Sequence, residues 1–255
     1  MGSNSGRSPL RVLCLGDSLT GGFPAQHPYG GKLEERLEAA FPTTHHVEVE
    51  VDGVPGEMVT GGRFARRMRN LWRMYPDERA FDWTIVLGGT NDLAWRHPAS
   101  EVLQELERVW AIPLSKGSKV LALTIPECKV VNEALDEARK TINDGIKACN
   151  KQNFYTFDLH KAVPFHSMST EDRVKYWDPD GVHFTEAGYD LIGEKVAEGL
   201  IKILHLEEAQ STEISSIVSD ERQRKLIEEL IFEEERGNPR LLSQGWIIVR
   251  KRDLD

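Results

Sequence analysis

The chain has 255 residues, enough for one well-buried α/β domain with an additional segment. It carries 32 Lys and Arg against 41 Asp and Glu, a formal net charge of −9, which argues against a nucleic-acid-binding protein because such proteins need a concentrated basic surface. No apolar run approaches membrane-spanning length, and residues 1–8 show no signal peptide. The three cysteines, Cys14, Cys128 and Cys149, form a sparse, odd set that is typical of a reducing compartment. We therefore expect a cytoplasmic protein.

Short apolar segments alternate with amphipathic segments along the chain. We expect β-strands at residues 11–16, 47–51, 83–87, 119–125 and 154–159. We expect helices at residues 29–41, 57–75, 101–114, 132–150 and 184–206, with Ser100 and Thr185 as N-caps. Val and Glu alternate over residues 47–51, which favours an edge strand. Parallel strands need crossover connections, so this order predicts an α/β fold with a five-stranded parallel sheet covered on both faces.

The composition changes after about Glu207. A charged helix with an apolar stripe is expected over residues 219–235, and a terminal strand over residues 245–252. We therefore predict one core domain over residues 10–206 and an extension of the same domain over residues 207–255. The pattern leaves open whether this extension docks on the core, forms a lid over a substrate site, serves a partner protein or makes a homodimer contact.

The first motif with chemical potential follows the first predicted strand and reads Gly16-Asp17-Ser18-Leu19-Thr20. Ligands of such sheets bind outside the carboxyl ends of the strands, so Ser18 would face a cleft. Gly16 allows a sharp turn of the backbone. Taken alone, the motif is equally typical of an ordinary turn.

Two further motifs offer donors for an oxyanion. Val54-Pro55-Gly56 follows the second strand, where Gly56 can present its backbone N–H, with Gly53 as an alternative for the same role. Gly89-Thr90-Asn91-Asp92 follows the third strand, and Asn91 supplies a neutral side-chain amide. Each motif is also common in turns and helix caps.

The fourth motif, Trp177-Asp178-Pro179-Asp180-Gly181-Val182-His183, pairs an acid with a histidine. A turn at Gly181 can bring the Asp180 carboxylate to one imidazole nitrogen of His183, which leaves the other nitrogen free to accept a serine proton. The other seven histidines have no such companion in the sequence and are interpreted as structural or solvated. They are His27, His45, His46, His97, His160, His166 and His205.

A metal site is the less favoured interpretation of these residues. His45 and His46 would point to opposite faces of a strand, which separates them as ligands beside Glu48. The acidic loop around His183 lacks the scaffold of three convergent ligands that a catalytic zinc site needs. We predict no metal and no cofactor.

In combination, GDSLT, GTND and DGVHFTEAGY occur in an order that resembles the GDSL, or SGNH, hydrolase family over about residues 10–205. The resemblance implies a flavodoxin-like three-layer α/β/α sandwich, with residues 10–206 as the SGNH hydrolase domain. It also implies a serine esterase of carboxylic esters, with Ser18 as nucleophile, His183 as general base and Asp180 as its orienting acid. The oxyanion hole would combine the backbone N–H groups of Ser18 and Gly56 with the Asn91 side chain.

The sequence departs from the family pattern after Thr20. Several intracellular bacterial arylesterases and acyltransferases of the family have an aromatic residue where this chain has Gly21-Gly22-Phe23, so we expect a roomier or more mobile entrance. The expected partner is a small-molecule ester and not a nucleic acid. Two alternatives stay open: an acyltransferase that uses the same residues, and a non-catalytic flavodoxin-like binding module.

Overall fold

The structure is a computed structural model that describes residues 7–74 and 81–219, with side chains as far as residue 209. The described part divides into two compact units, the first ending at Ile201 and the second beginning at Lys202. Most of the extension predicted for residues 207–255, including its terminal strand, lies outside the described residues. The division into a domain and an extension therefore stays a prediction.

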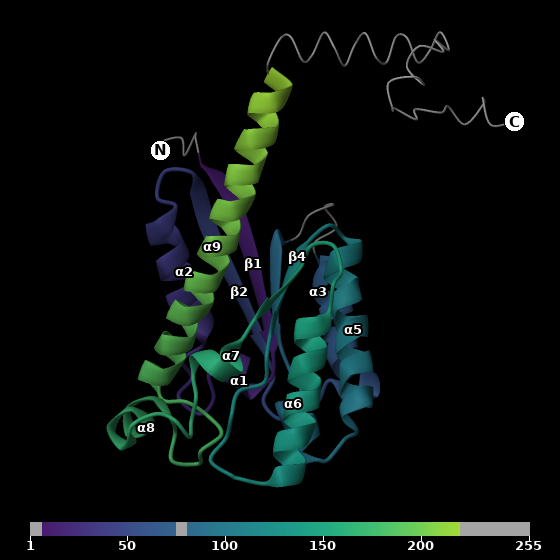
Figure 1. Cartoon of the computed structure of the whole chain (residues 1–255), viewed down its shortest axis with the longest axis vertical. Helices are drawn as coiled ribbons and strands as arrows, with labels where there is room; N and C mark the ends of the chain where they lie inside the picture. The colour runs from purple at the N-terminus through teal and green to yellow at the C-terminus, as the bar shows by residue number, and fades with distance from the viewer. Residues whose placement is uncertain (1–6, 75–80, 220–255) are drawn as a thin grey trace, which may run out of the picture. The chain divides into compact units, whose positions relative to one another are not determined.

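A five-stranded parallel sheet forms the centre of the first unit (Figure 1). Its strands are β1 (Ser8–Gly16), β2 (His45–Gly53), β3 (Trp83–Leu87), β4 (Lys119–Leu123) and β5 (Phe154–Phe157). Their order is β2-β1-β3-β4-β5, the flavodoxin-like arrangement. The predicted parallel sheet is confirmed, and β2 lies at an edge as its alternating sequence indicated.

Helices cover both faces of the sheet, with α2 and the first part of α9 on one side and α3, α5 and α6 on the other (Figure 1). The helices are α1 (Ser18–Gly21), α2 (Tyr29–Ala40), the 3-10 helix η1 (Thr60–Gly62), α3 (Arg63–Met74), α4 (Thr90–Ala94), α5 (Ala99–Ser115), α6 (Glu133–Ala148), α7 (Leu159–Ala162), α8 (Thr170–Tyr176) and α9 (Glu186–Ser219). This is the expected three-layer α/β/α architecture.

Two predicted helix starts need correction. The helix expected from residue 57 begins only at Arg63, because Gly61 and Gly62 adopt left-handed φ values of 76° and 78°. Ser100 lies inside α5, whose N-cap position is taken by Pro98 at a φ of −58°. Thr185 is confirmed as an N-cap, since its Oγ1 accepts a hydrogen bond of 3.1 Å from Gly188 N.

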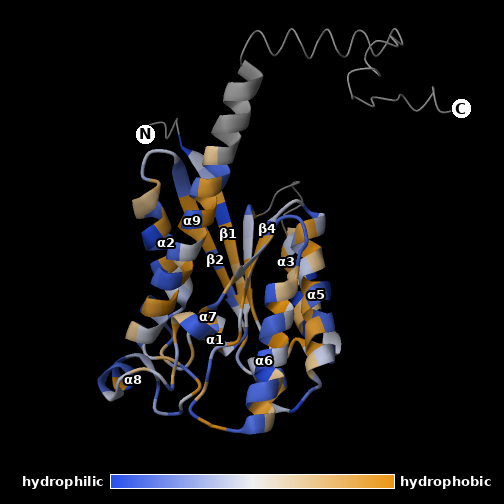
Figure 2. Ribbon diagram, in the orientation of Figure 1, coloured by the Kyte–Doolittle hydropathy of each residue, from blue (hydrophilic) through white to orange (hydrophobic). Residues whose placement is uncertain are grey.

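Apolar side chains of the strands fill the space between the sheet and the helices. Toward α3, α5 and α6, the fully buried residues include Leu13, Val86, Phe64 and Trp110. Figure 2 shows the same pattern as hydrophobic colour along the strands. Burial of this kind contributes about 25 cal/mol per Å² of apolar surface, which makes it the main stabilising term of the fold.

A close backbone contact joins the end of β2 to α1. Gly53, the last residue of β2, is paired with Gly16 in the parallel register. A Cβ atom on Gly53 would lie 2.1 Å from Gly21 N and 2.8 Å from Asp17 O. Only glycine fits here, so the absence of a side chain at Gly53 fixes α1 against the edge strand.

We expect Gly53→Ala to lower the free energy of unfolding by about 2–3 kcal/mol, because the added methyl group meets backbone atoms that cannot move aside. Gly31→Ala is the matched control: Gly31 lies in α2, and a methyl group added there would have no atom within 4 Å, so we expect a gain of about 0.5–1 kcal/mol. Urea denaturation measures both values. Equal stability of the Gly53 variant and the wild type would contradict the close contact.

Candidate active site

The order of the strands places three chain segments together at one end of the sheet. The chain runs from β1 to β2 on one side and then to β3 on the other, so β1 lies at the point where the strand order reverses. Gly16 at the end of β1 is paired with Gly53 of β2 and with Leu87 of β3. The segments that follow these strands therefore begin side by side, at the position where open α/β sheets bind ligands. They carry Ser18, Gly56 and Asn91.

A chain of hydrogen bonds links Ser18 to His183 and Asp180. The His183 Nε2 atom lies 2.9 Å from Ser18 Oγ, and His183 Nδ1 lies 2.6 Å from Asp180 Oδ2. Ser18 is only 6% exposed, whereas the carboxylate of Asp180 is partly open to solvent. The structure thus brings Ser18 next to His183, which is 165 residues later in the chain, and next to its neighbour Asp180. A serine nucleophile and its base require hydrogen-bond distances of this kind.

The loop that follows α8 holds the carboxylate of Asp180 in place. Its Oδ1 atom accepts hydrogen bonds from Val182 N at 2.8 Å and His183 N at 2.9 Å. Partial burial raises the pKa of Asp180, but the hydrogen bonds from the backbone and ring of His183 outweigh burial, so the pKa lies below its usual range. Asp180 is therefore ionised at neutral pH and can orient the imidazole.

The three oxyanion candidates occupy three neighbouring turns. Ser18 is the first residue of α1, so its N–H has no acceptor within the helix. Gly56 has a φ of 76° and follows Pro55 in a turn closed by a 3.2 Å bond from Glu57 N to Val54 O, the pattern of a type II turn. Gly56 is exposed at the tip of this turn. The alternative candidate, Gly53, is explained by its close packing instead.

The Asn91 side chain bridges the other two segments. Its Nδ2 atom donates to Glu57 O at 2.9 Å and lies 3.4 Å from Asp17 Oδ2. Among the described contacts, Gly56 is joined to Asn91 only through its neighbour Glu57. The amide of Asn91 is therefore held at the meeting point of the loops after β1, β2 and β3.

Gly21, Gly22 and Phe23, the residues after Thr20 that depart from the family pattern, have packing roles in the structure. Gly22 ends α1 with a φ of 75°, and Gly21 packs against the backbone of Gly53. The ring of Phe23 then lies 5.0 Å from the imidazole of His183 in an edge-to-face contact. The two glycines thus serve packing and turning, and they place an aromatic ring beside His183.

Two charged residues to which the sequence analysis gave no role hold these loops together. Buried Asp92 accepts hydrogen bonds from Val59 N at 2.9 Å, Thr60 N at 3.0 Å and Thr60 Oγ1 at 2.7 Å. Arg67 of α3 donates to Gly16 O at 2.7 Å and pairs with Glu57 at 2.6 Å. Asp92 belongs to the third motif, but nothing local marks Arg67, because its partners Glu57, Asp52 and Gly16 are 10, 15 and 51 residues away.

Asp17, directly before the serine, is fully buried and its Oδ1 accepts a 3.0 Å hydrogen bond from Leu19 N. Burial raises the pKa of Asp17 to about 7, the hydrogen bond from Leu19 opposes this shift, and the charge of Asp92 adds to it. A proton at this position would change the charge next to the Asn91 amide near neutral pH.

The interpretation of the other histidines as residues without an acidic companion needs correction. His27 has an acidic companion that its sequence neighbourhood did not indicate, since its Nε2 lies 2.8 Å from Asp190 Oδ1 on α9. Three more of these histidines lie within 3.8 Å of a carboxylate: His46 beside Glu48, His97 beside Glu101 and His205 beside Glu208. Within the described residues, no group of three or more His, Cys, Asp and Glu could hold a metal ion. In the same part of the chain, no helix is both long and apolar enough to cross a membrane. The cytoplasmic location stays a prediction.

A model of the GDSL-like Lipase/Acylhydrolase family matches residues 14–191. The chain belongs to this family. No curated protein matches the chain in sequence. By family, the protein is a GDSL-like acylhydrolase.

Solved structures of GDSL proteins and esterases share its fold. A lipolytic protein of the G-D-S-L family from Veillonella parvula has 22% identity and a TM-score of 0.59, covering 74% of this chain and 97% of that chain. A family 3 carbohydrate esterase from Clostridium thermocellum has 16% identity and a TM-score of 0.59, covering 77% of this chain and 99% of that chain. A psychrotrophic esterase from Pseudoalteromonas sp. has 16% identity and a TM-score of 0.57, covering 76% of this chain and 98% of that chain. At these identities the likeness shows the α/β fold of the GDSL hydrolases.

The raised pKa of Asp17 predicts a pH-dependent stability of this GDSL protein. The native state disfavours the ionised form, so the contribution of Asp17 is fully present below its ordinary pKa of 3.8 and is lost as the pH rises through about 7. Asp17→Asn keeps the acceptor for Leu19 N and removes the titration. We expect the stability of the variant relative to wild type to rise by about 4 kcal/mol between pH 4 and pH 8, from ~1.4 kcal/mol per pKa unit. Urea unfolding across this range measures the difference, and a constant difference would contradict the assignment.

Proposed function

We propose that this protein is a serine esterase that hydrolyses carboxylic esters through an acyl-enzyme on Ser18. The observation that carries the proposal is the continuous path from Asp180 Oδ2 through His183 to Ser18 Oγ, with steps of 2.6 and 2.9 Å. Both distances are within hydrogen-bond reach, so proton transfer from the hydroxyl to the imidazole needs no rearrangement. Membership of the acylhydrolase family and the fold shared with known esterases support the same reaction.

In the first half of the proposed reaction, Ser18 Oγ attacks the ester carbonyl while His183 Nε2 takes its proton. The negative charge that forms on the carbonyl oxygen is stabilised by the N–H groups of Ser18 and Gly56 and by the Asn91 amide. Collapse of the tetrahedral intermediate breaks the bond to the alcohol, which leaves with the proton from His183. Asp180 stays ionised and stabilises the imidazolium throughout.

In the second half, water attacks the acyl group on Ser18 and gives its proton to His183. The second tetrahedral intermediate releases the carboxylic acid, and the proton returns to Ser18 Oγ. An acyltransferase would use an alcohol or amine in place of this water with the same residues. Product analysis with a competing alcohol separates the two reactions.

The nucleophile assignment is tested with Ser18→Ala and with Ser100→Ala, an exposed serine of α5, as matched control. We expect Ser18→Ala to lower the hydrolysis of a short p-nitrophenyl ester by about 10⁴-fold or more. A fluorophosphonate probe should label the wild type and the control but not the Ser18 variant. The Pseudoalteromonas esterase is described as inhibited by monoethylphosphonate, which supports this class of probe. Hydrolysis or labelling that survives Ser18→Ala would overturn the assignment of Ser18 as nucleophile. A wild type that neither hydrolyses the ester nor reacts with the probe would favour the non-catalytic alternative.

The oxyanion assignment is tested with Asn91→Ala. Loss of one donor to the oxyanion is expected to lower kcat by about 10²–10³-fold with little change in KM, because the bond strengthens in the transition state. Asn70→Ala on the exposed surface of α3 is the matched control and should keep wild-type kinetics. A loss of kcat below about threefold would remove Asn91 from the oxyanion hole.

A further inference from the structure

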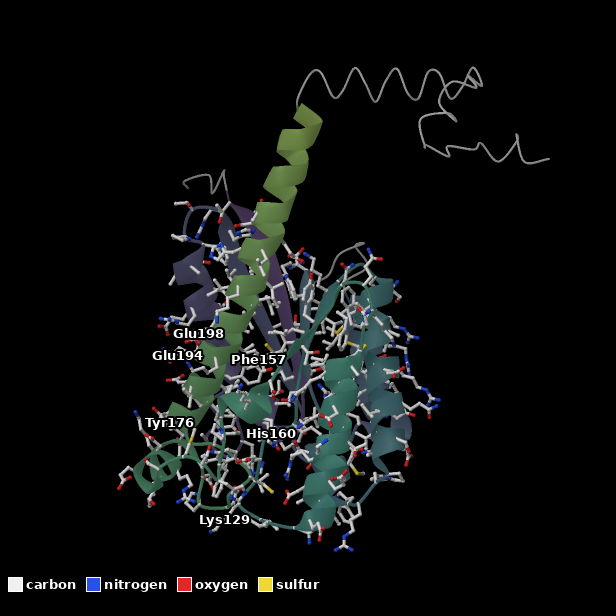
Figure 3. The ribbon with its side chains drawn as sticks, viewed as in Figure 1. Lys129, Phe157, His160, Tyr176, Glu194 and Glu198 are labelled. Carbon is white, nitrogen blue, oxygen red and sulfur yellow. The ribbon has the colours of Figure 1, made fainter. Side chains whose placement is uncertain are left out.

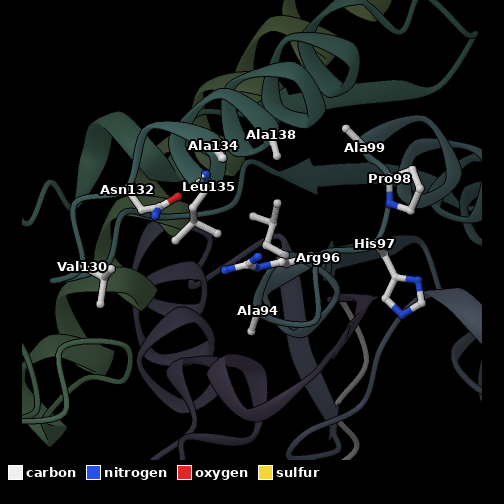
Figure 4. Close-up of a pocket in the computed structure, with 11 residues that line it drawn as sticks. Ala94, Arg96, His97, Pro98, Ala99, Val130, Asn132, Ala134, Leu135 and Ala138 are labelled. Atoms are coloured by element: carbon white, nitrogen blue, oxygen red, sulfur yellow. Dashed lines mark hydrogen bonds between the residues drawn. The ribbon is translucent and has the colours of Figure 1, made fainter.

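A cavity of about 610 Å³ opens between α4 and α6 (Figure 4). Apolar side chains form much of its wall, among them Leu93 and Ala94 of α4 and Leu135 and Ala138 of α6. Val130, 58% exposed, lines it from the connection between β4 and α6. The cavity is large enough for a substituent of several non-hydrogen atoms.

Two connections place this cavity next to the candidate active site. Leu93 and Ala94 follow Asn91 within the same short helix, α4. On the other side, Lys129 N donates a 2.7 Å hydrogen bond to Gly181 O, which fastens the residue before Val130 to the loop of Asp180 and His183. Figure 3 shows Lys129 at the end of the molecule toward which the strands point. The cavity therefore shares α4 with Asn91 and is joined through Lys129 to the loop of Asp180 and His183.

Two polar side chains of the cavity, Arg96 and Asn132, can donate hydrogen bonds to a ligand. Arg96 contributes a guanidinium that points toward α6 (Figure 4). The Oδ1 atom of Asn132 accepts from Leu135 N at 2.9 Å, so the amide nitrogen of Asn132 is the group left to bind a ligand. No Asp or Glu is among the described lining residues, but the carboxylate of Glu101 lies 3.6 Å from Nδ1 of the lining residue His97. Among the described residues, Arg96 has no ion pair. These donors are complementary to an anion.

Arg96 occupies a backbone position that favours glycine. At the end of α4, Arg96 N donates to Leu93 O at 3.0 Å and His97 N donates to Asp92 O at 2.9 Å, the two bonds of a Schellman motif. The first residue after the C-cap of such a motif has a positive φ and is therefore normally glycine. Arg96 occupies this position with a φ of 58°. An arginine here is unfavourable for the backbone, and residues held in such conformations cluster at functional sites. The positive φ of Arg96 and its place in the cavity wall are thus two independent observations that point to a functional role of this residue.

We propose that this cavity binds a carboxylate group on the substrate, held by the Arg96 guanidinium, so that the enzyme prefers esters with a negatively charged substituent. The inference rests on the proposed esterase function and specifies its substrate class. Arg96 binds the carboxylate through charge-assisted hydrogen bonds and takes no part in the bond-breaking steps.

The test compares anionic esters with neutral esters of the same size. One series consists of monoethyl esters of dicarboxylic acids from succinate to suberate. The neutral partner of each ester has a carboxamide in place of the free carboxylate. A second series places the same groups on the alcohol side, as acetate esters of hydroxy acids and hydroxy amides. For each pair, the ratio of kcat/KM for the anionic and neutral ester is measured, and background hydrolysis is taken from Ser18→Ala.

We expect the wild type to favour the anionic member about five- to tenfold in at least one series, the range of a partly solvated ion pair. Arg96→Gly should reduce this ratio to about one, and Arg96→Lys should keep part of it. The melting temperature of Arg96→Gly should rise by a few degrees because glycine relieves the positive φ. A gain in stability together with a loss of selectivity separates binding from misfolding.

Asn153→Gly is the matched control, since Asn153 also has a positive φ, 60°, and lies directly before β5 at the opposite end of the sheet. It should become more stable without any change in the ratio. Serine-dependent hydrolysis with a ratio near one in both series, or a ratio that survives Arg96→Gly, would overturn this inference and leave the esterase function standing. Absence of Ser18-dependent hydrolysis for every ester would overturn the proposed function and this inference with it.

Discussion

The parallel pairing of β1 with a neighbour on each side is the constraint on which the whole site depends. Because Gly16 is in register with both Gly53 and Leu87, β1, β2 and β3 end at the same level of the sheet, and the segments that follow them begin close together. The right-handed crossover rule then sends the following helices to opposite faces of the sheet, which leaves the space above β1 open. Ser18 enters this space because it comes two residues after the strand ends.

Side chains from distant parts of the sequence turn this proximity into fixed geometry. Arg67 reaches the carbonyl of Gly16 and the carboxylate of Glu57, and Asn91 reaches the carbonyl of Glu57 from the other side. Asp92 fixes the start of η1 through three hydrogen bonds. Charge-assisted bonds of this kind contribute about 1.5–3 kcal/mol each when buried, enough to hold loops that have little apolar surface of their own. The rigidity of the site thus comes from bonds between loops.

The sequence predicted those parts of the structure that local patterns determine. Alternation of apolar segments gave the sheet and its helices, and the short spacing of Asp180 and His183 around a glycine predicted their contact, which the structure contains. The pair Gly61-Gly62 weakens the predicted start of the helix at residue 57, but the sequence does not show that both glycines adopt left-handed φ values and delay the start to Arg63. Arg67 and the pairing of His27 with Asp190 were missed for another reason: their partners are far away in the chain, and their own neighbourhoods carry no motif. The roles of Ser18, Gly56 and Asn91 remain proposals that the geometry supports.

The position of β2 at the edge of the sheet has a consequence for local opening of the native state. An edge strand is held by one neighbour only, so its ladder opens at a lower free-energy cost than that of β1 or β3. The turn that carries Gly56 continues from this strand, whereas Ser18 and Asn91 continue from interior strands. Partial opening would therefore displace the Gly56 turn while the serine and histidine stay in contact. In such a state the proposed nucleophile would be intact, but the proposed donor Gly56 would no longer face the developing charge.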